Sequence, residues 1–199
     1  MRQLILIRHP ATDLAGTFCG HTDPNLSAVG LTQLHALQRR LDRVPLDRLC
    51  SSDLLRARRC AEALAEQHGI QATLGPALRE MHFGDWEGLR WDEIQTRFPA
   101  QAQRWLQGFT TFTPPRAEPY AQFTARISRR VEEWLQDDSW TTLAIVTHRG
   151  VLQFILQTIC GVDATAAWHL SSKYGTTLFC APTAGAHSPF AVRETWHPL

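Results

Sequence analysis

The fold is decided by the stretch at residues 4–9, LILIRH, together with its counterpart at residues 143–148, LAIVTH. Each begins with a short unbroken apolar run, which is typical of a β-strand buried on both faces of a sheet. Between the two stretches, strand-like and helix-like segments alternate along the chain. This alternation predicts an α/β fold with a largely parallel central sheet.

The remaining elements follow from apolar periodicity and from residues that cap helices. We expect helices from Ser27 to about residue 41, from a cap at Ser52 or Asp53 to near Gly69, and at 120–135 and 149–160. Further strands are expected at 46–50, 70–74, 176–181 and 190–194. The segment 81–119 is rich in Trp, Pro and Gly, and we expect it to form a lid-like insertion over one end of the sheet, within a single domain at residues 1–199.

Composition excludes several classes of protein. The 199 residues are 44% hydrophobic and 20% charged, which is ordinary for a globular domain and argues against disorder. A formal net charge of +1 without a basic stripe argues against a nucleic-acid binder. The apolar runs are too short to span a bilayer, and the N-terminus reads as a strand rather than a signal peptide. The five cysteines are widely spaced without a CxxC pair, which favours a reducing cytoplasm over a disulfide framework or a zinc site.

The two apolar strands both end in histidine. Ligands of open α/β sheets bind beyond the carboxyl ends of the strands, so Arg8, His9 and His148 are expected to converge there. Arg56 lies in the first turn of the helix expected after Ser52 or Asp53, where a cation is unfavourable unless an anion is bound nearby. This cationic set, with no carboxylate in its strands, predicts a phosphate site.

A carboxyl group for proton transfer is expected in the segment 80–88, EMHFGDWEG. Either Glu80 or Glu87 could be held in a partly apolar pocket, where a carboxyl group can donate a proton near neutral pH.

Four stretches carry a resemblance to a known family. They are LIRHPAT at 6–12, SSDLLRA at 51–57, EMHFGDWEG at 80–88 and VTHRG at 146–150. A lone histidine is more often a structural residue than a functional one. The four stretches, however, resemble the motifs of the histidine phosphatase superfamily, in the branch of the cofactor-dependent phosphoglycerate mutases, and they occur in the family order. The resemblance implies a three-layer α/β sandwich with helices on both faces of a mostly parallel sheet.

The resemblance also implies roles for individual residues. His9 would be the nucleophile that becomes phosphohistidine, and Arg8, Arg56 and His148 would bind the phosphoryl oxygens. Glu80 would protonate the leaving oxygen and then activate water. Fixed cations would take the place of a metal ion, so neither a metal nor another cofactor is expected.

A hydroxyl position of the first motif is matched by Thr12, which is a further candidate for substrate binding. The chain departs from the family pattern at three positions. Pro10 and Arg149 replace common glycines, and Ala15 replaces an asparagine that contacts phosphate in many relatives. Pro10 and Arg149 directly follow the two histidines, and none of the three departures removes a catalytic group.

Within the family, the chain looks most like the α-ribazole phosphatases of cobalamin nucleotide-loop assembly. The stretches concerned are FGDWE at 83–87, YAQFTARI at 120–127 and WHL at 168–170. The expected reaction is hydrolysis of a small phosphoester, α-ribazole 5′-phosphate, with no nucleic-acid or membrane partner. A phosphoglycerate mutase and a non-catalytic phospholigand-binding module remain alternatives, although the chain is shorter than such mutases usually are. The sequence does not define an oligomeric state.

Overall fold

A mixed sheet forms the centre of the protein, in a computed structural model that describes residues 2–184 and 188–198. The described residues form six strands in the order β3-β2-β4-β1-β5-β6. The strands are β1 (Gln3–Arg8), β2 (Arg48–Ser52), β3 (Ala72–Gly75), β4 (Thr142–Thr147), β5 (Thr177–Pro182) and β6 (Phe190–Trp196). β3, β2, β4 and β1 run parallel, and β5 and β6 add an antiparallel edge. The predicted mostly parallel α/β sheet is therefore confirmed.

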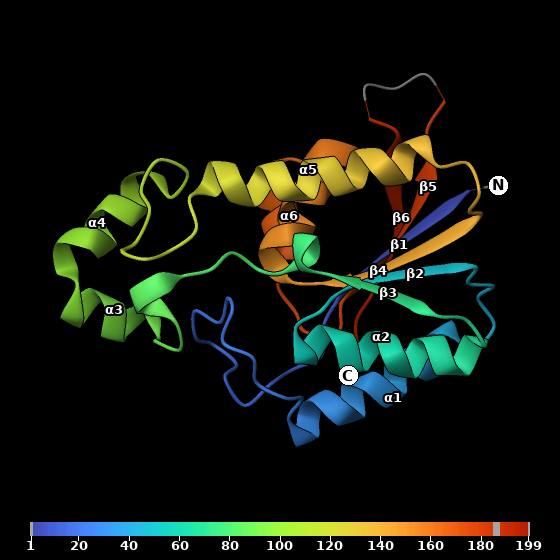
Figure 1. Ribbon diagram of the computed structural model, residues 1–199, viewed down its shortest axis with the longest axis horizontal. Helices are drawn as coiled ribbons and strands as arrows, with labels where there is room; N and C mark the ends of the chain where they lie inside the picture. The colour runs from blue at the N-terminus through green and yellow to red at the C-terminus, as the bar shows by residue number, and fades with distance from the viewer. Residues whose placement is uncertain (1, 185–187, 199) are drawn as a thin grey trace.

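Helices cover both faces of the sheet, as Figure 1 shows. α1 (Ala28–Leu41) and α2 (Leu55–His68) pack on one face, and α5 (Tyr120–Gln136) and α6 (Arg149–Ile159) pack on the other. Side chains of β1 alternate between the layers: Ile5 and Ile7 join the cluster of α1 and α2, whereas Leu4 and Leu6 join that of α5 and α6. This confirms the three-layer sandwich. No helix of the described residues is long and apolar enough to cross a bilayer.

Helix α1 begins as expected, because the Ser27 hydroxyl accepts a hydrogen bond from the Gly30 N–H. The expected cap of α2 is wrong. Its N-cap is Leu54, without a capping side chain, since β2 continues through Ser52 and carries that serine into the sheet. The first N–H of α2, from Leu55, instead donates to the Asp23 carboxylate at 2.6 Å. Gly69 ends the helix in the left-handed conformation, as expected.

The segment 81–119 contains a short 3₁₀ turn, η2 (Gly84–Trp86), and the helices α3 (Trp91–Arg97) and α4 (Pro99–Gly108). At the left of Figure 1, α3 and α4 lie beyond the end of the sheet. A small apolar cluster of its own stabilises the segment, formed by Trp86, Ile94, Ala102 and Phe112. Trp86 is fully buried in this cluster, so its indole packs the segment together and does not face a ligand. A further short helix, α7 (Ala164–Leu170), follows α6, and the 3₁₀ turn η1 (Pro76–Leu78) follows β3.

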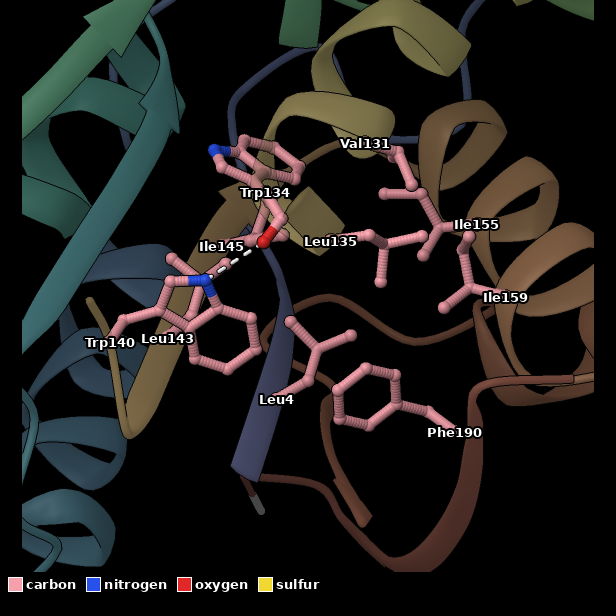
Figure 2. Close-up of a pocket in the computed structure, with 10 residues that line it drawn as sticks. All are labelled: Leu4, Val131, Trp134, Leu135, Trp140, Leu143, Ile145, Ile155, Ile159 and Phe190. Carbon is pink, nitrogen blue, oxygen red and sulfur yellow. Dashed lines mark hydrogen bonds between the residues drawn. The ribbon is translucent and has the colours of Figure 1, made fainter. Parts of the chain in front are cut away.

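A small apolar pocket lies between the sheet and the pair α5 and α6 (Figure 2). It is lined by hydrophobic side chains, among them Leu4 near the start of β1 and Trp140 just before β4. The indole N–H of Trp140 is already bonded to the Trp134 carbonyl oxygen at 3.0 Å. The pocket offers no charged or nucleophilic group and lies at the opposite end of β1 from His9. It is therefore part of the core packing rather than a catalytic site.

Candidate active site

The two histidines meet because their strands are neighbours. β1 and β4 are parallel, and Arg8 pairs with Thr147 at the carboxyl end of the ladder. His9 and His148 are the next residues of each strand, and their ring centroids lie 5.0 Å apart. Both side chains are buried, with 6% and 1% of their surface exposed. The structure thus brings His9 and His148 together at this edge of the sheet, as expected.

The His9 ring is oriented by a hydrogen bond to the backbone. Its Nδ1 lies 2.7 Å from the Pro10 carbonyl oxygen, which accepts a hydrogen bond from Nδ1–H and leaves the Nε2 lone pair free. Burial, with the nearby charges of Arg56 and Arg8, lowers the pKa of His9 well below its usual value. The imidazole is therefore neutral at neutral pH, which is the nucleophilic form. Pro10 supplies this orienting carbonyl, so proline at this position is compatible with a His9 ring whose Nε2 is free.

Arg8 is held by the loop that precedes β5. Its guanidinium lies 3.9 Å from the ring centroid of Tyr174, and its Nη1 donates to the carbonyl oxygens of Ser171, at 3.1 Å, and Ser172. Burial lowers the pKa of Arg8 to about 10, which keeps the side chain protonated at neutral pH. Tyr174 also lies beside His9, with ring centroids 5.5 Å apart. Sequence reasoning missed this tyrosine, because it lies outside every stretch that carries the family resemblance.

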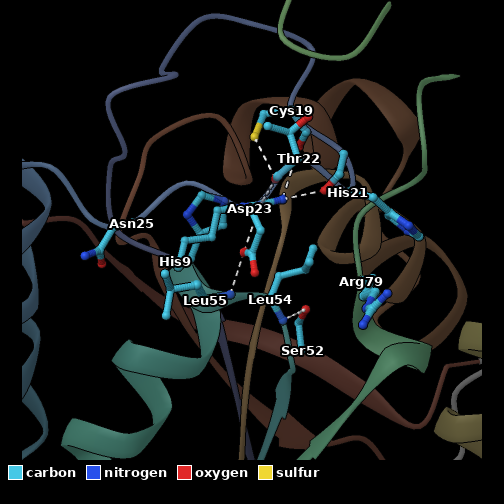
Figure 3. A network of polar contacts seen from close by, with 12 residues as sticks. His9, Cys19, His21, Thr22, Asp23, Asn25, Ser52, Leu54, Leu55 and Arg79 are labelled. Atoms are coloured by element: carbon cyan, nitrogen blue, oxygen red, sulfur yellow. Dashed lines mark hydrogen bonds and ion pairs between the residues drawn. The ribbon is translucent and has the colours of Figure 1, made fainter. Parts of the chain in front are cut away.

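Arg56 is the second residue of α2 and is 1% exposed. Its guanidinium donates to the carbonyl oxygens of Gly20 and Thr22, each at 2.8 Å, and of Cys19 at 3.2 Å. The only carboxylate of the described residues within ion-pair range is that of Asp23, at 4.0 Å from Nη1. Figure 3 shows this loop, with Asp23 reaching Leu55 at the start of α2 and His9 nearby. The loop of residues 19–23 therefore positions the arginine.

Arg8, Arg56 and His148 each have one buried nitrogen atom without a hydrogen-bond partner among the described residues. These atoms are Nε of Arg8, Nε of Arg56 and Nδ1 of His148. Burial, together with the charges of Arg56, His9 and Arg8, also lowers the pKa of His148 well below its usual value. Buried donors are almost always satisfied in folded proteins, and an oxyanion supplies acceptors for all three. The site is thus built to take an anion with several oxygens.

Glu80 lies at the same site and is 8% exposed. Its carboxylate accepts hydrogen bonds from the Gly150 N–H at 2.9 Å and from the Met81 N–H at 3.1 Å. A Cβ atom at Gly150 would lie 2.4 Å from Oε1, so a larger residue there would displace the Glu80 carboxylate. Burial lowers the pKa of Arg8 and of Arg149, and the charge of Glu80 opposes that shift in both, so the carboxylate lies near both guanidinium groups.

Glu87, the other candidate, has a different task. Its carboxylate accepts five hydrogen bonds, from the N–H groups of Gly20, His21, Thr22 and Phe83 and from the Thr22 hydroxyl. Burial raises the pKa of Glu87, but these hydrogen bonds outweigh burial and hold the pKa below its usual value. A carboxylate that is ionised and already accepts five hydrogen bonds is unsuited to proton transfer. The arrangement favours Glu80 as the acid.

The remaining positions are peripheral to this set. Thr12 is buried and pairs through its backbone with Leu26, and among the described residues no side-chain hydrogen bond of its hydroxyl is found. Its contact with substrate stays a prediction. Arg149, the first residue of α6, stacks its guanidinium 3.6 Å from the ring centroid of Trp168. Within the described part of the chain, no group of three or more His, Cys, Asp or Glu side chains is arranged to hold a metal ion.

The geometry agrees with the comparisons. The family model of the histidine phosphatase superfamily (branch 1) matches residues 4–184, and the chain therefore belongs to that superfamily. An adenosylcobalamin/alpha-ribazole phosphatase of Salmonella typhimurium is 29% identical over 175 residues, which cover 87% of each chain. Phosphoserine phosphatase 1 of Hydrogenobacter thermophilus is 28% identical over 171 residues, covering 84% of this chain and 81% of that one.

Solved structures are similar over nearly the whole chain. The crystal structure of the alpha-ribazole phosphatase from Shigella flexneri superposes with a TM-score of 0.85 at 26% identity, covering 96% of this chain and 94% of that one. The family resemblance predicted from the four motifs is confirmed, and the chain is a phosphatase of this superfamily.

Proposed function

We propose that the protein hydrolyses α-ribazole 5′-phosphate to α-ribazole and inorganic phosphate through a phosphohistidine at His9. The observation that carries the chemistry is the convergence of two buried neutral imidazoles with two guanidinium groups that have unpartnered Nε atoms. The relatives named for α-ribazole phosphatase activity support the substrate.

In the first half-reaction, Nε2 of His9 attacks phosphorus while the bond to the leaving oxygen breaks. Glu80, in its protonated form, gives its proton to that oxygen, so the alcohol leaves neutral. Arg8, Arg56 and Nδ1–H of His148 stabilise the charge on the transferring oxygens. Because these hydrogen-bond donors are fixed before substrate arrives, little reorganisation is needed in the transition state.

In the second half-reaction, the Glu80 carboxylate takes a proton from water as that water attacks phosphorus. The P–N bond to His9 then breaks, inorganic phosphate leaves, and Glu80 is again protonated. The hydrogen bonds from Gly150 and Met81 hold the carboxylate in one position through both steps. Thr12 is proposed to contact substrate beside His9.

The leaving-group side of the site is proposed to include the exposed face of Trp168, which is 53% exposed. An aromatic ring beside a phosphate site suits the planar base of a nucleotide-like ester, and Arg149 on the indole fixes its orientation. We propose that the segment 81–119 acts as a lid over this side. All five cysteines are free, which supports a reducing cytoplasm as the place of reaction.

A panel of phosphoesters ranked by kcat/KM tests the substrate, with α-ribazole 5′-phosphate, phosphoserine and p-nitrophenyl phosphate compared. We expect α-ribazole 5′-phosphate to rank first, and Trp168→Ala to lower its kcat/KM more than that of p-nitrophenyl phosphate. Excess EDTA should leave every rate unchanged. A higher kcat/KM for phosphoserine would contradict the substrate proposal. Exchange of 3- and 2-phosphoglycerate after addition of 2,3-bisphosphoglycerate would favour a mutase, and no turnover of any ester would favour a binding module.

A further inference from the structure

Strand β2 ends in two adjacent serines whose hydroxyl groups have different hydrogen-bond partners. Ser51 and Ser52 are both fully buried. Successive side chains of a strand point to opposite faces of the sheet, so the two hydroxyls lie in different layers. The Ser51 hydroxyl donates to the Ser52 carbonyl oxygen at 2.8 Å. The Ser52 hydroxyl lies 2.8 Å from Nε2 of His148.

The other hydrogen bonds of the Ser52 hydroxyl determine which group donates in its bond with His148. The Ser52 oxygen already accepts a hydrogen bond from the Leu54 N–H at 3.3 Å, visible in Figure 3. Among the described residues, the serine proton has no other acceptor than Nε2. If Nε2 carried a proton and donated to the serine, the buried hydroxyl proton would be left unsatisfied. The arrangement that satisfies every group is donation from Ser52 to Nε2.

The proton of His148 is on the opposite ring nitrogen. Burial and the neighbouring arginines lower the pKa of His148, so its imidazole is neutral and carries a single proton. With Nε2 accepting from the serine, that proton is on Nδ1. Nδ1 is the buried atom of this ring without a partner among the described residues. It is therefore an N–H donor available to the anion that the site binds.

We propose that Ser52 is a positioning residue that holds His148 in the Nδ1–H tautomer, so that the ring donates a hydrogen bond to the transferring phosphoryl group. In the opposite tautomer, a lone pair would face the phosphoryl oxygens and repel them. The inference rests on the proposed function in one respect only, namely that His148 faces the phosphoryl group. It assigns to the second arginine motif a task besides presenting Arg56.

Kinetics of three variants separate this role from packing. Ser52→Ala removes the donor, and Ser52→Cys keeps the side-chain volume while replacing the hydroxyl by a weak donor. We expect both to lower kcat and kcat/KM for p-nitrophenyl phosphate by roughly 10- to 100-fold, the range for losing an orienting partner. Ser51→Ala removes an equally buried hydroxyl on the other face, and we expect it to keep wild-type kcat. Thermal unfolding of each variant shows whether it is folded.

The tautomer is read directly from the ¹⁵N NMR signals of the His148 ring, assigned with His148→Asn, with and without inorganic phosphate. We expect protonated Nδ1 and unprotonated Nε2 in the wild type, and a mixture of tautomers or protonated Nε2 in Ser52→Ala. A wild-type ring protonated on Nε2, or wild-type kcat in both Ser52 variants, would overturn the inference. If the tautomers are as expected but the wild type hydrolyses no ester, the proposed function fails while the positioning of His148 stands.

Discussion

Replacing Glu87 by glutamine removes the negative charge and one of the two oxygen atoms that accept hydrogen bonds from the 19–22 loop. Oε2 of Glu87 accepts from Gly20 and Thr22 N–H and from the Thr22 hydroxyl, at 3.1, 3.0 and 2.7 Å. Oε1 accepts from His21 and Phe83 N–H, each at 2.9 Å. The amide NH₂ of glutamine accepts nothing, so its best orientation leaves the two donors at Oε1 without an acceptor.

The expected loss of stability follows from those two donors. A buried donor without a partner destabilises by about 1–3 kcal/mol, and both N–H groups are only partly buried, so we expect roughly 2 kcal/mol in total. Because the loop carbonyls hold Arg56, the loosened loop should also lower kcat/KM, by about tenfold, or roughly 1.4 kcal/mol of transition-state stabilisation.

Urea unfolding of Glu87→Gln at pH 7, with kcat/KM for p-nitrophenyl phosphate, measures both effects. Glu132→Gln, an exposed change of the same chemistry on α5, is the control and should change stability by less than about 0.5 kcal/mol. The pKa of Glu87 is lowered in the folded protein, so its stabilisation is present above the usual value of 4.5 and is lost as pH falls through the folded pKa. Unchanged stability in Glu87→Gln would refute this account of the loop. Complete loss of activity, with activity retained in Glu80→Gln, would make Glu87 the acid.

Three further predictions concern the site itself. Arg56→Ala should raise the activation free energy by about 2–4 kcal/mol, measured as kcat/KM, because a preorganised donor to the phosphoryl oxygens is lost; a neutral result would remove Arg56 from the site. Glu80→Gln should lower kcat/KM for α-ribazole 5′-phosphate by about 10²- to 10⁴-fold and for p-nitrophenyl phosphate much less, since p-nitrophenolate leaves without a proton and kcat/KM reports formation of phosphohistidine, not its hydrolysis; equal losses of kcat/KM for both esters would argue against proton donation. The pKa values of His9 and His148 are lowered in the folded protein, so below the usual value of 6.5 the unfolded chain binds more protons than the folded one. The free energy of unfolding should therefore decrease as pH is lowered below 6.5, by up to about 1.4 kcal/mol per pH unit for each ring. His9→Asn should reduce that slope, and an unchanged slope would show that His9 is not held neutral.

Much of the site could be predicted from sequence because it is made by strand ends. In a parallel sheet, residues that follow buried strands share one edge, so His9 and His148 had to meet once their apolar runs were neighbours. The start of α2 could not be predicted in the same way. Ser52 is a residue type that often caps helices, and only its pairing with Gly75 of β3 shows that it continues the strand. Its hydrogen bond with His148 likewise appears only in the structure.

Other parts depend on contacts that no local pattern records. Tyr174 contacts Arg8 from a loop that is distant from Arg8 in sequence, so residue spacing does not predict the contact. The residues alone left Glu80 and Glu87 open because both lie in one loop motif, and the family resemblance implied Glu80. The hydrogen bonds of the two carboxylates, which no sequence pattern records, favour the same residue. Arg149 was visible as a departure from the family pattern, but its stacking on Trp168 depends on where α7 packs against α6.

The central claim is that Nε2 of His9 becomes phosphorylated. Rapid quenching into alkali during turnover of p-nitrophenyl phosphate, followed by peptide mapping and ³¹P NMR, locates the phosphoryl group to a residue and a ring nitrogen. We predict a phosphoryl group on Nε2 of His9, since Nδ1–H is bonded to the Pro10 carbonyl oxygen, and none in His9→Asn. Turnover without a phosphorylated protein, or a phosphoryl group on His148, would contradict the account.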